Sequence, residues 1–183
     1  MKLSTLLSFT LLHIVYRQIF GAQSALSAGC GADYTAFDCA APQTNADWIF
    51  GTQKGFQTFN CAGKNYVGNY AAGDSIFLSL NNLPPHNVVF MKWNVARLDD
   101  WLCDQEFIVY ADGEEIFAKH LVSNFTNYCG DSNWYDGLWT LGKIFNHSTS
   151  TLTLEFTSSL NESAASESWG ICGLEIYYVN GEI

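Results

Sequence analysis

The sequence predicts an all-β protein, a two-sheet antiparallel β-sandwich that is jelly-roll-like and stabilised by disulfides. Three observations favour this class. Several short runs rich in β-branched and aromatic residues are separated by Gly, Asn, Asp and Pro. Outside the N-terminal segment, no stretch combines a helical period of apolar residues with helix caps. Six cysteines lie beyond that segment, and a chain of 183 residues that is 48% hydrophobic can bury the core of one domain.

The strand candidates follow one another along the chain. The strongest cover residues 75–80, 88–95, 106–111, 115–118, 151–156 and 170–179, and weaker ones cover residues 48–50, 57–59 and 138–145. Asp112-Gly113 separates two of these runs and predicts a tight hairpin turn. Residues 151–156 alternate Thr or Glu with Leu or Phe, as expected of a strand with one buried face. Residues 30–74 hold three cysteines and many glycines, so we expect loops there that disulfides fix in place.

Residues 1–24 have the layout of a secretory signal peptide. Met1 and Lys2 give a positive start, residues 3–16 are mainly apolar, and small residues follow. A buried helix or a signal anchor is the alternative, but the apolar run is shorter than the roughly 20 residues that span a bilayer. We therefore expect a cleaved signal and a single β-sandwich domain over residues 25–183, secreted or held at the cell surface.

The acidic balance of the chain restricts its partners. The chain has 8 basic and 18 acidic residues, a net charge of −10. Cleavage of the signal removes Lys2 and Arg17, which leaves 6 basic residues and a net charge of −12. Such a charge argues against nucleic acid and against anionic membrane surfaces, and it permits a calcium ion. No second apolar run reaches membrane length, so we expect no membrane span.

Cysteines and glycosylation sequons both indicate export. The cysteines are Cys30, Cys39, Cys61, Cys103, Cys129 and Cys172. An even number in an exported chain predicts three disulfides, for which 15 connectivities are possible. A zinc site is the alternative, but the chain has no CxxC pair and no histidine at zinc-finger spacing from a cysteine pair. Sequons at Asn124, Asn146 and Asn161 predict N-glycosylation at surface positions.

Residues 99–106 form the most acidic stretch, with four carboxylates in eight residues. Carboxylates crowded on a loop repel one another unless a cation or hydrogen bonds compensate, and calcium takes several such oxygen ligands. The alternative is a solvated acidic loop. Glu167, beside Trp169 and just before the last strand candidate, is expected to bind backbone amides or an ion. We expect Trp169 itself to lie in the core.

Residues 134–139 are rich in aromatic side chains. Trp134, Tyr135 and Trp139 could stack on sugar rings, with Asp131 nearby to bind hydroxyl groups. The alternative, which we favour because tryptophan is highly buried on average, is that these rings cover the sandwich core.

Catalytic motifs are scarce. The chain has no Gly-x-Ser-x-Gly nucleophile motif, and neither His86 nor His147 has a nucleophile at a recognisable spacing. Glu106 and Glu167 could form the carboxylate pair of a glycosidase, but the sequence does not fix their separation.

A series of short motifs spans most of the chain. They are Cys61-Ala62-Gly63 and residues 67–70, Leu83-Pro84-Pro85-His86, residues 98–107 followed by Asp112-Gly113, Cys129-Gly130, His147 before residues 151–154, and Glu167-Ser168-Trp169-Gly170-Ile171. In this order they resemble the "LPPH … DSWD-x-E-x-F … DG … ESWGI" signature of a family of secreted and cell-surface domains of ciliates, other protists and some bacteria. The resemblance implies an all-β extracellular module that is not an enzyme.

Two cysteines depart from this signature. Cys103 belongs to an insertion within the "DSWD" motif, and Cys172 directly follows "ESWGI". The resemblance therefore implies a Cys103–Cys172 disulfide and leaves the pairing of the other four cysteines open. Such a bridge would bring together four candidate calcium ligands, which are Asp100, Asp104, Glu106 and Glu167.

These observations lead to one expected function and two alternatives. We expect a secreted binding or surface-coat module without catalytic activity, whose partner is an extracellular protein or a glycan. It requires no cofactor, although calcium is a candidate. The first alternative is a calcium-dependent carbohydrate-binding domain, and the second is a small glycoside hydrolase that uses Glu106 and Glu167.

Overall fold

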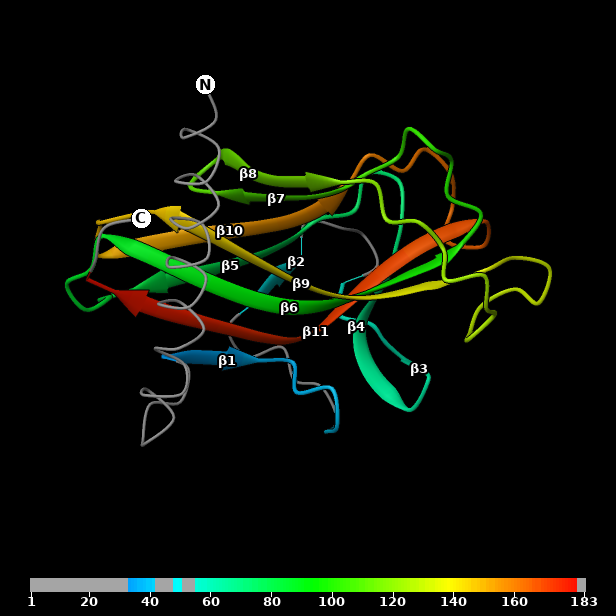
Figure 1. The fold of residues 1–183 in the computed structure, drawn as a ribbon, viewed down its shortest axis with the longest axis horizontal. Coiled ribbons are helices and arrows are strands. Elements are labelled where there is room, and N and C mark those ends of the chain that lie inside the picture. Colours follow the sequence, from blue (N-terminus) through cyan, green and yellow to red (C-terminus); the bar gives the residue numbers. More distant parts are fainter. Residues whose placement is uncertain (1–32, 42–47, 51–54, 181–183) are drawn as a thin grey trace, which may run out of the picture. The chain divides into compact units, whose positions relative to one another are not determined.

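The structure is a computed structural model that describes residues 33–41, 48–50 and 55–180. This part of the chain consists of strands and connecting segments without a helix (Figure 1). The strands are β1 (Tyr34–Ala36), β2 (Trp48–Phe50), β3 (Thr58–Cys61), β4 (Lys64–Tyr70), β5 (Ile76–Asn81), β6 (Val88–Asp99), β7 (Phe107–Ala111), β8 (Glu114–Lys119), β9 (Gly137–Asn146), β10 (Thr151–Ser158) and β11 (Glu167–Val179). None of the described residues belongs to a helix that could cross a membrane. The predicted signal peptide, residues 1–24, lies outside the described residues.

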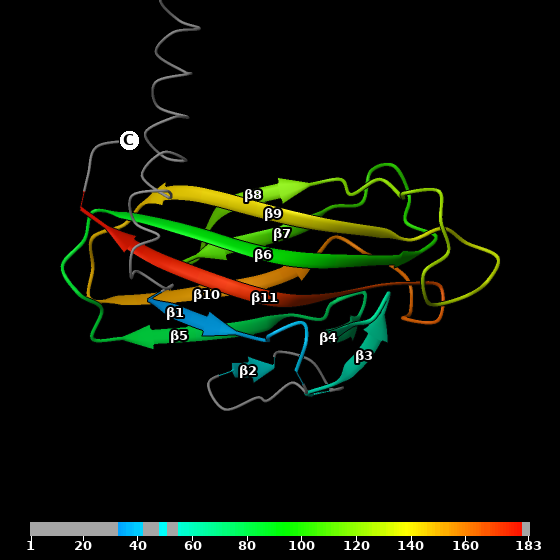
Figure 2. The same cartoon turned by 60° about the horizontal axis from the view of Figure 1, so that its bottom comes forward.

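The strands form two antiparallel sheets (Figures 1 and 2). The first sheet has the order β3-β4-β11-β6-β9, with β1 also paired to β11. The second has the order β2-β5-β10-β7-β8. From β5 onward the chain crosses to the other sheet at every connection except the β7–β8 hairpin. This alternation confirms the predicted jelly-roll-like β-sandwich.

Aromatic side chains fill the space between the sheets. Trp93 of β6 meets Phe117 and Phe156 of the opposite sheet edge-on, at centroid distances of 5.4 and 6.0 Å. Trp169 of β11 meets Phe107 of β7 in the same way at 5.3 Å. Trp93 and Trp169 are completely buried, which confirms the expected core position of Trp169. Edge-to-face contacts stabilise such pairs beyond the burial of their area.

The strand predictions are largely confirmed, and each of the nine candidates overlaps a strand of the structure. β1 and β4 are the strands that the sequence did not predict. β4 contains Asn65, Gly68 and Asn69, residue types that are depleted in strands. It is a strand because it pairs with β3 on one side and with β11 on the other, so tertiary pairing outweighs local propensity.

Three disulfides were predicted, and the described residues contain two of them, but not the one specific pair that was predicted. Cys39 pairs with Cys172, and Cys61 pairs with Cys129, while Cys103 is exposed and unpaired among the described residues. The implied Cys103–Cys172 bridge is therefore wrong, and Cys30 lies outside the described residues.

The extended conformation of β11 explains this error. Glu167 pairs with Asp99, next to the loop that carries Cys103, but Cys172 pairs with Asn94 further along the sheet. Five residues of strand span about 16 Å, whereas disulfide-bonded Cα atoms lie within about 7 Å. The segment after β1 lies beside Cys172 instead, because Gly173 donates its N–H to the Phe37 carbonyl. Cys103 and Cys172 each lie beside a motif of the signature, but the two cysteines are far apart in space.

Candidate functional site

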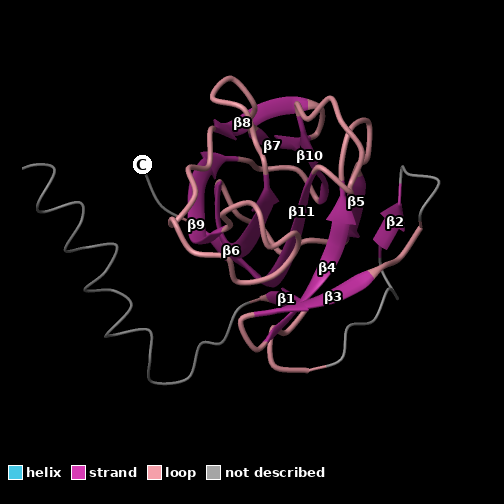
Figure 3. Ribbon diagram, turned by 90° about the vertical axis from the view of Figure 1, so that its right-hand side faces the viewer, coloured by secondary structure: helices cyan, strands magenta, loops and turns pink. Residues whose placement is uncertain are grey.

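Two long loops meet at one end of the sandwich, where β6 ends and β9 begins. Residues 120–136 connect β8 to β9, and we call them the aromatic loop. Residues 100–106 connect β6 to β7, and we call them the acidic loop. Arg97 of β6 pairs with Gly137 of β9, so both loops lie at the same end of these two strands. They extend to the right in Figure 1, and Figure 3 views the sandwich from this end.

The aromatic loop exposes four aromatic side chains. They are Phe125 at 80% exposure, Tyr135 at 55%, Trp134 at 44% and Tyr128 at 42%. The rings of Phe125 and Tyr135 stand edge-to-face with centroids 6.1 Å apart. The favoured interpretation that Trp134 and Tyr135 cover the core is therefore wrong, because both face solvent. Exposed rings of this kind make the loop a candidate binding surface.

Trp139 has a different role from the other two predicted stacking residues. It lies on β9, is half-buried and packs against the core, so the favoured interpretation is confirmed for this ring. Its indole N–H donates to the Val122 carbonyl at 3.2 Å, and the Lys119 ammonium lies 5.2 Å from its ring centre. These contacts tie the beginning of the aromatic loop to the sheet, so Trp139 supports the loop.

A buried carboxylate binds main-chain groups of the aromatic loop from the interior of the protein. Asp136 is completely buried. One carboxylate oxygen accepts hydrogen bonds from the main-chain N–H groups of Tyr128 and Cys129, at 2.7 and 2.8 Å. The other accepts from the N–H of Asp99 at 3.1 Å. Because Cys129 is also bonded to Cys61, the middle of the loop is fixed both covalently and by hydrogen bonds.

Asp99 provides a second support. Its carboxylate accepts a hydrogen bond from the N–H of Asp131 at 2.7 Å. The pKa of Asp99 is raised above its usual value, chiefly by burial. The Asp131 N–H opposes this shift, and the charge of Asp136 adds to it. Gly130 lies so close that a Cβ there would be 2.6 Å from an Asp99 oxygen. Gly130 also has a φ of 93°, which other residues rarely adopt, so both the backbone and the space favour glycine here.

Arg97 links the two loops. Its guanidinium is buried and donates to the carbonyls of Tyr135 and, at 3.2 Å, Trp101. Burial lowers the pKa of Arg97, and the nearby carboxylate of Asp136 opposes this shift. The Trp101 indole in turn donates to the Ser168 carbonyl at 3.1 Å. Arg97 thus fixes the main chain beside one exposed ring, Tyr135, from inside the protein.

Short-range hydrogen bonds order the tip of the loop. The Asn127 amide donates to the carbonyls of Asp131 and Trp134, at 2.6 and 2.9 Å. Asp131 in turn accepts from the main chain and the side chain of Asn133, at 2.9 and 2.7 Å. These four hydrogen bonds link the residues of the tip to one another while its rings stay exposed.

The four predicted calcium ligands are not gathered into one group. Glu167 is buried, and one of its oxygens accepts the N–H groups of Asn161 and Glu162, at 2.8 and 2.6 Å. This confirms that it binds backbone amides. Asp100 and Asp104 are exposed on the acidic loop, and Glu106 is half-buried. Among the described residues, no group of three or more His, Cys, Asp or Glu side chains could hold a metal ion.

The sequence did not identify the residues that support the aromatic loop. Asp99 begins the acidic stretch noted above, but nothing in the sequence relates it or Arg97 to Asp136, and only the fold brings the three together. One signal was available, since Asp99 and Cys129-Gly130 both belong to the motifs quoted above. The three sequon asparagines, Asn124, Asn146 and Asn161, are exposed as glycosylation would require.

No protein-family model matches the chain, and no curated protein sequence matches it. Solved structures do share its fold. A carbohydrate-binding module described for specific mannan recognition, TmCBM27, matches 80% of this chain and 96% of its own length with a TM-score of 0.51 and 6% identity. The CBM36-1 domain of a xylanase from the hindgut metagenome of Trinervitermes trinervoides covers 82% of this chain and 98% of its own (TM-score 0.48, 16% identity).

A third solved structure is the C-terminal CBM6 of LamC, a marine laminarinase from Zobellia galactanivorans. It covers 79% of this chain and 99% of its own length with a TM-score of 0.47 and 14% identity. At these identities the likeness concerns architecture. The chain has a β-sandwich fold of the kind found in carbohydrate-binding modules.

Proposed function

We propose that this protein is a secreted, non-catalytic binding module that recognises glycans through the aromatic loop. The observation that carries the proposal is the exposure of Phe125, Tyr128, Trp134 and Tyr135 on a loop that buried groups hold rigid. Aromatic rings offer a flat apolar face to the C–H face of a sugar ring. A loop that is ordered before binding loses little conformational entropy when the ligand arrives.

The charge of the surroundings favours a neutral glycan. Asp131 lies within the loop, and Asp100 and Asp104 are exposed on the neighbouring acidic loop. Arg97, the cation nearest to the exposed rings in the contacts above, is buried and bound to two carbonyls. A sulfated or uronic acid polymer would meet more exposed carboxylates than cations here, since Lys119 is the exposed cation that the contacts above place beside the loop, and like charges repel.

The non-catalytic part of the proposal rests on Glu167. Its carboxylate oxygen is occupied by two main-chain N–H groups and the side chain is buried, which suits support of the 161–167 turn. The glycosidase alternative needs this group to contact substrate. Secretion agrees with the two disulfides, and membership of the protist cell-surface family remains a prediction from the motifs.

A panel of immobilised polysaccharides tests the proposal. Neutral mannan, xylan and β-glucan should retain the protein, whereas alginate and heparin should not. Retention should be lost in Trp134→Ala and Tyr135→Ala and kept in Val179→Ala, which truncates an exposed apolar side chain at the end of β11. Retention by no glycan, or equal retention of all three variants, would contradict the proposal.

Calcium dependence is the alternative form of the same activity. Binding to the retained polysaccharide, measured in calcium and in EDTA, separates the two forms. Equal binding in both supports recognition by the aromatic loop alone. Loss in EDTA, together with a calcium-dependent rise in melting temperature, supports an ion held by Asp100, Asp104 and Glu106.

A further inference from the structure

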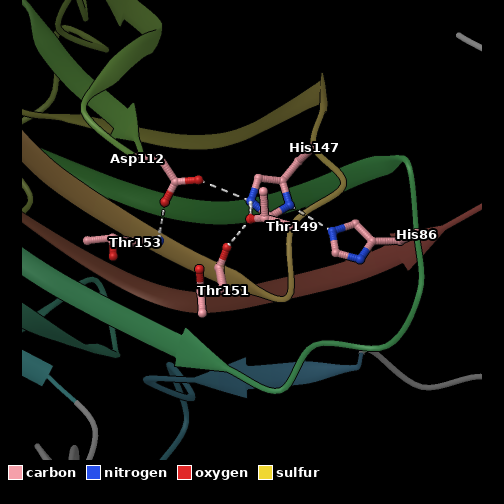
Figure 4. Close-up of polar contacts among 6 residues, drawn as sticks. All are labelled: His86, Asp112, His147, Thr149, Thr151 and Thr153. Atoms are coloured by element: carbon pink, nitrogen blue, oxygen red, sulfur yellow. Dashed lines mark hydrogen bonds and ion pairs between the residues drawn. The ribbon is translucent and has the colours of Figure 1, made fainter.

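Two histidines and an aspartate form a continuous chain of hydrogen bonds at the opposite end of the sandwich (Figure 4). His86 Nδ1 lies 2.6 Å from the Pro84 carbonyl, and His86 Nε2 lies 2.7 Å from His147 Nδ1. His147 Nε2 lies 3.1 Å from Asp112 Oδ2. His86 and the His147 side chain are both largely buried, so bulk water cannot replace these contacts.

These hydrogen bonds join three connecting segments that lie far apart in sequence. His86 precedes β6, His147 follows β9, and Asp112 lies in the β7–β8 turn. Asp112 also accepts the N–H of Thr153 on β10 at 2.8 Å. Because β6 and β9 belong to one sheet and β7, β8 and β10 to the other, these bonds tie the two sheets together at this end. We call His86, His147 and Asp112 the histidine clasp.

The first half of the clasp requires two protons. The Pro84 carbonyl can only accept a hydrogen bond, so His86 Nδ1 must carry a proton. The contact between His86 Nε2 and His147 Nδ1 requires a second proton on one of these two nitrogens. A pair of neutral imidazoles has two protons in total, and both are now assigned.

The second half of the clasp requires a third proton. Thr149 Oγ1 lies 2.6 Å from the Thr151 carbonyl, which can only accept, so the hydroxyl proton of Thr149 points there. Thr149 Oγ1 can then only accept from His147 Nε2, 3.2 Å away, as can the carboxylate of Asp112. A proton must therefore lie between His147 Nε2 and Asp112. Imidazole is a stronger base than a carboxylate, so His147 Nε2 carries this proton.

We propose that the folded protein holds one extra proton on the His86–His147 pair, balanced by Asp112, and that this proton closes one end of the sandwich in a pH-dependent manner. Its loss leaves two nitrogen lone pairs, or a lone pair and a carboxylate oxygen, facing each other at hydrogen-bond distance. Uptake of a further proton instead places two N–H groups face to face. The clasp is complete only with three protons.

Tyr178, Tyr34 and Asp33 are the other titratable groups that the described part of the chain places near the clasp. The Tyr178 ring on β11 lies 5.0 Å from the His86 ring, and Asp33 accepts the N–H of Tyr178 at 2.7 Å. Burial, with smaller contributions from Asp33 and Tyr34, raises the pKa of Tyr178 to about 12. The phenol therefore stays neutral across the range of interest, and Asp112 is the carboxylate that the described contacts place against the imidazoles.

The direction of the pH dependence follows from proton linkage. Histidines of an unfolded chain are mostly neutral above a pH of about 6.5, so the folded protein binds more protons than the unfolded one at neutral pH. Stability then falls as pH rises. We expect the melting temperature to be lower at pH 8.5 than at pH 6.5 by about 2–4 °C or more.

Asp112→Asn tests the proton count without removing the contacts. The asparagine oxygen can still accept from Thr153, and its amide can donate to His147 Nε2, so every bond is satisfied with two ring protons. Asparagine also tolerates the positive φ of 51° at this position. We expect this variant to lose the fall in melting temperature between pH 6.5 and 8.5. A variant that keeps the wild-type pH profile would overturn the proposal.

Imidazole ¹⁵N spectra count the protons directly. At pH 6.5 the wild-type His86–His147 pair should show three protonated nitrogens, and Asp112→Asn should show two. Two protonated nitrogens in the wild type would also overturn the proposal. His120→Gln is the control, because His120 binds the Gln105 carbonyl outside the clasp and its removal should leave the signals of the pair unchanged.

Discussion

The Asp136 carboxylate accepts the main-chain N–H of Asp99 at 3.1 Å, and this contact joins the start of β9 to the end of β6 beneath the aromatic loop. The other oxygen of Asp136 binds two N–H groups within the loop, and Asp99 itself binds a third through its side chain. Two buried acidic residues thus determine the conformation of a loop whose aromatic rings are exposed.

Asp136→Asn should destabilise the protein and the loop together. The asparagine side chain can take two orientations. In one, its amide NH₂ faces the main-chain N–H groups of Tyr128 and Cys129, and in the other it faces the main-chain N–H of Asp99. Since unsatisfied buried donors cost about 1–3 kcal/mol each, we expect the free energy of unfolding to fall by about 3 kcal/mol. Urea denaturation measures this, and Asp131→Asn, an exposed position, should change it by less than about 0.5 kcal/mol.

Asp99→Asn should change how stability depends on pH. Because burial raises the folded-state pKa of Asp99, its contribution to stability is present at low pH and decreases as pH rises through that raised pKa. Asparagine keeps an oxygen for the Asp131 N–H and tolerates the φ of 66°. The free energy of unfolding of the wild type, relative to that of the variant, should therefore be highest near pH 3 and decrease towards pH 7. Unfolding measured at both pH values, with a constant difference between the proteins, would refute this.

Gly68→Ala should be severely destabilising. A Cβ at Gly68 would lie 2.3 Å from the Gly170 Cα and 2.6 Å from the Trp169 carbonyl oxygen, both main-chain atoms of the neighbouring strand β11. The strands would have to separate, so we expect a loss of at least about 2 kcal/mol. Gly142→Ala is the control, because a Cβ there meets its nearest atom at an ordinary 3.4 Å. Thermal melts that shift equally for both would contradict the close approach of β4 and β11.

Peptide mapping of the unreduced protein should recover two disulfide-linked peptides, Cys39–Cys172 and Cys61–Cys129. Cys103 is exposed on the acidic loop and is bonded to none of these four cysteines. Maleimide added without reductant should therefore leave all four unmodified. A Cys103–Cys172 peptide, or labelling at Cys61 or Cys129, would contradict this pairing.

The sequence predicted the fold better than the site, for a physical reason. Residues 151–156 reveal their strand because one buried face imposes alternation on neighbouring residues. The supports of the aromatic loop leave no such periodic trace, because Arg97, Asp99 and Asp136 meet only through the β6–β9 register. The burial of tryptophan in general was a poor guide to Trp134, whose loop is held by its backbone and does not need its ring in the core.

The histidine clasp illustrates the same difference between local and long-range information. His86 and His147 have no recognisable spacing from each other or from Asp112 in sequence. The antiparallel pairing of Val88 with Asn146 places the histidines beside each other, and the sheet packing adds Asp112. The predicted Asp-Gly hairpin at Asp112 was correct, but its contact with the other sheet could not be read from local residues.

The central claim is that the exposed rings of the aromatic loop bind sugar. Titration calorimetry of the wild type, Tyr135→Ala and Val179→Ala against an oligosaccharide of the best-retained polysaccharide tests it most directly. Truncation of an aromatic anchor at a binding surface costs about 2 kcal/mol, so Tyr135→Ala should raise the Kd by about 30-fold, while Val179→Ala leaves it unchanged. Equal Kd values for the three proteins would show that the sugar binds elsewhere and would contradict the account.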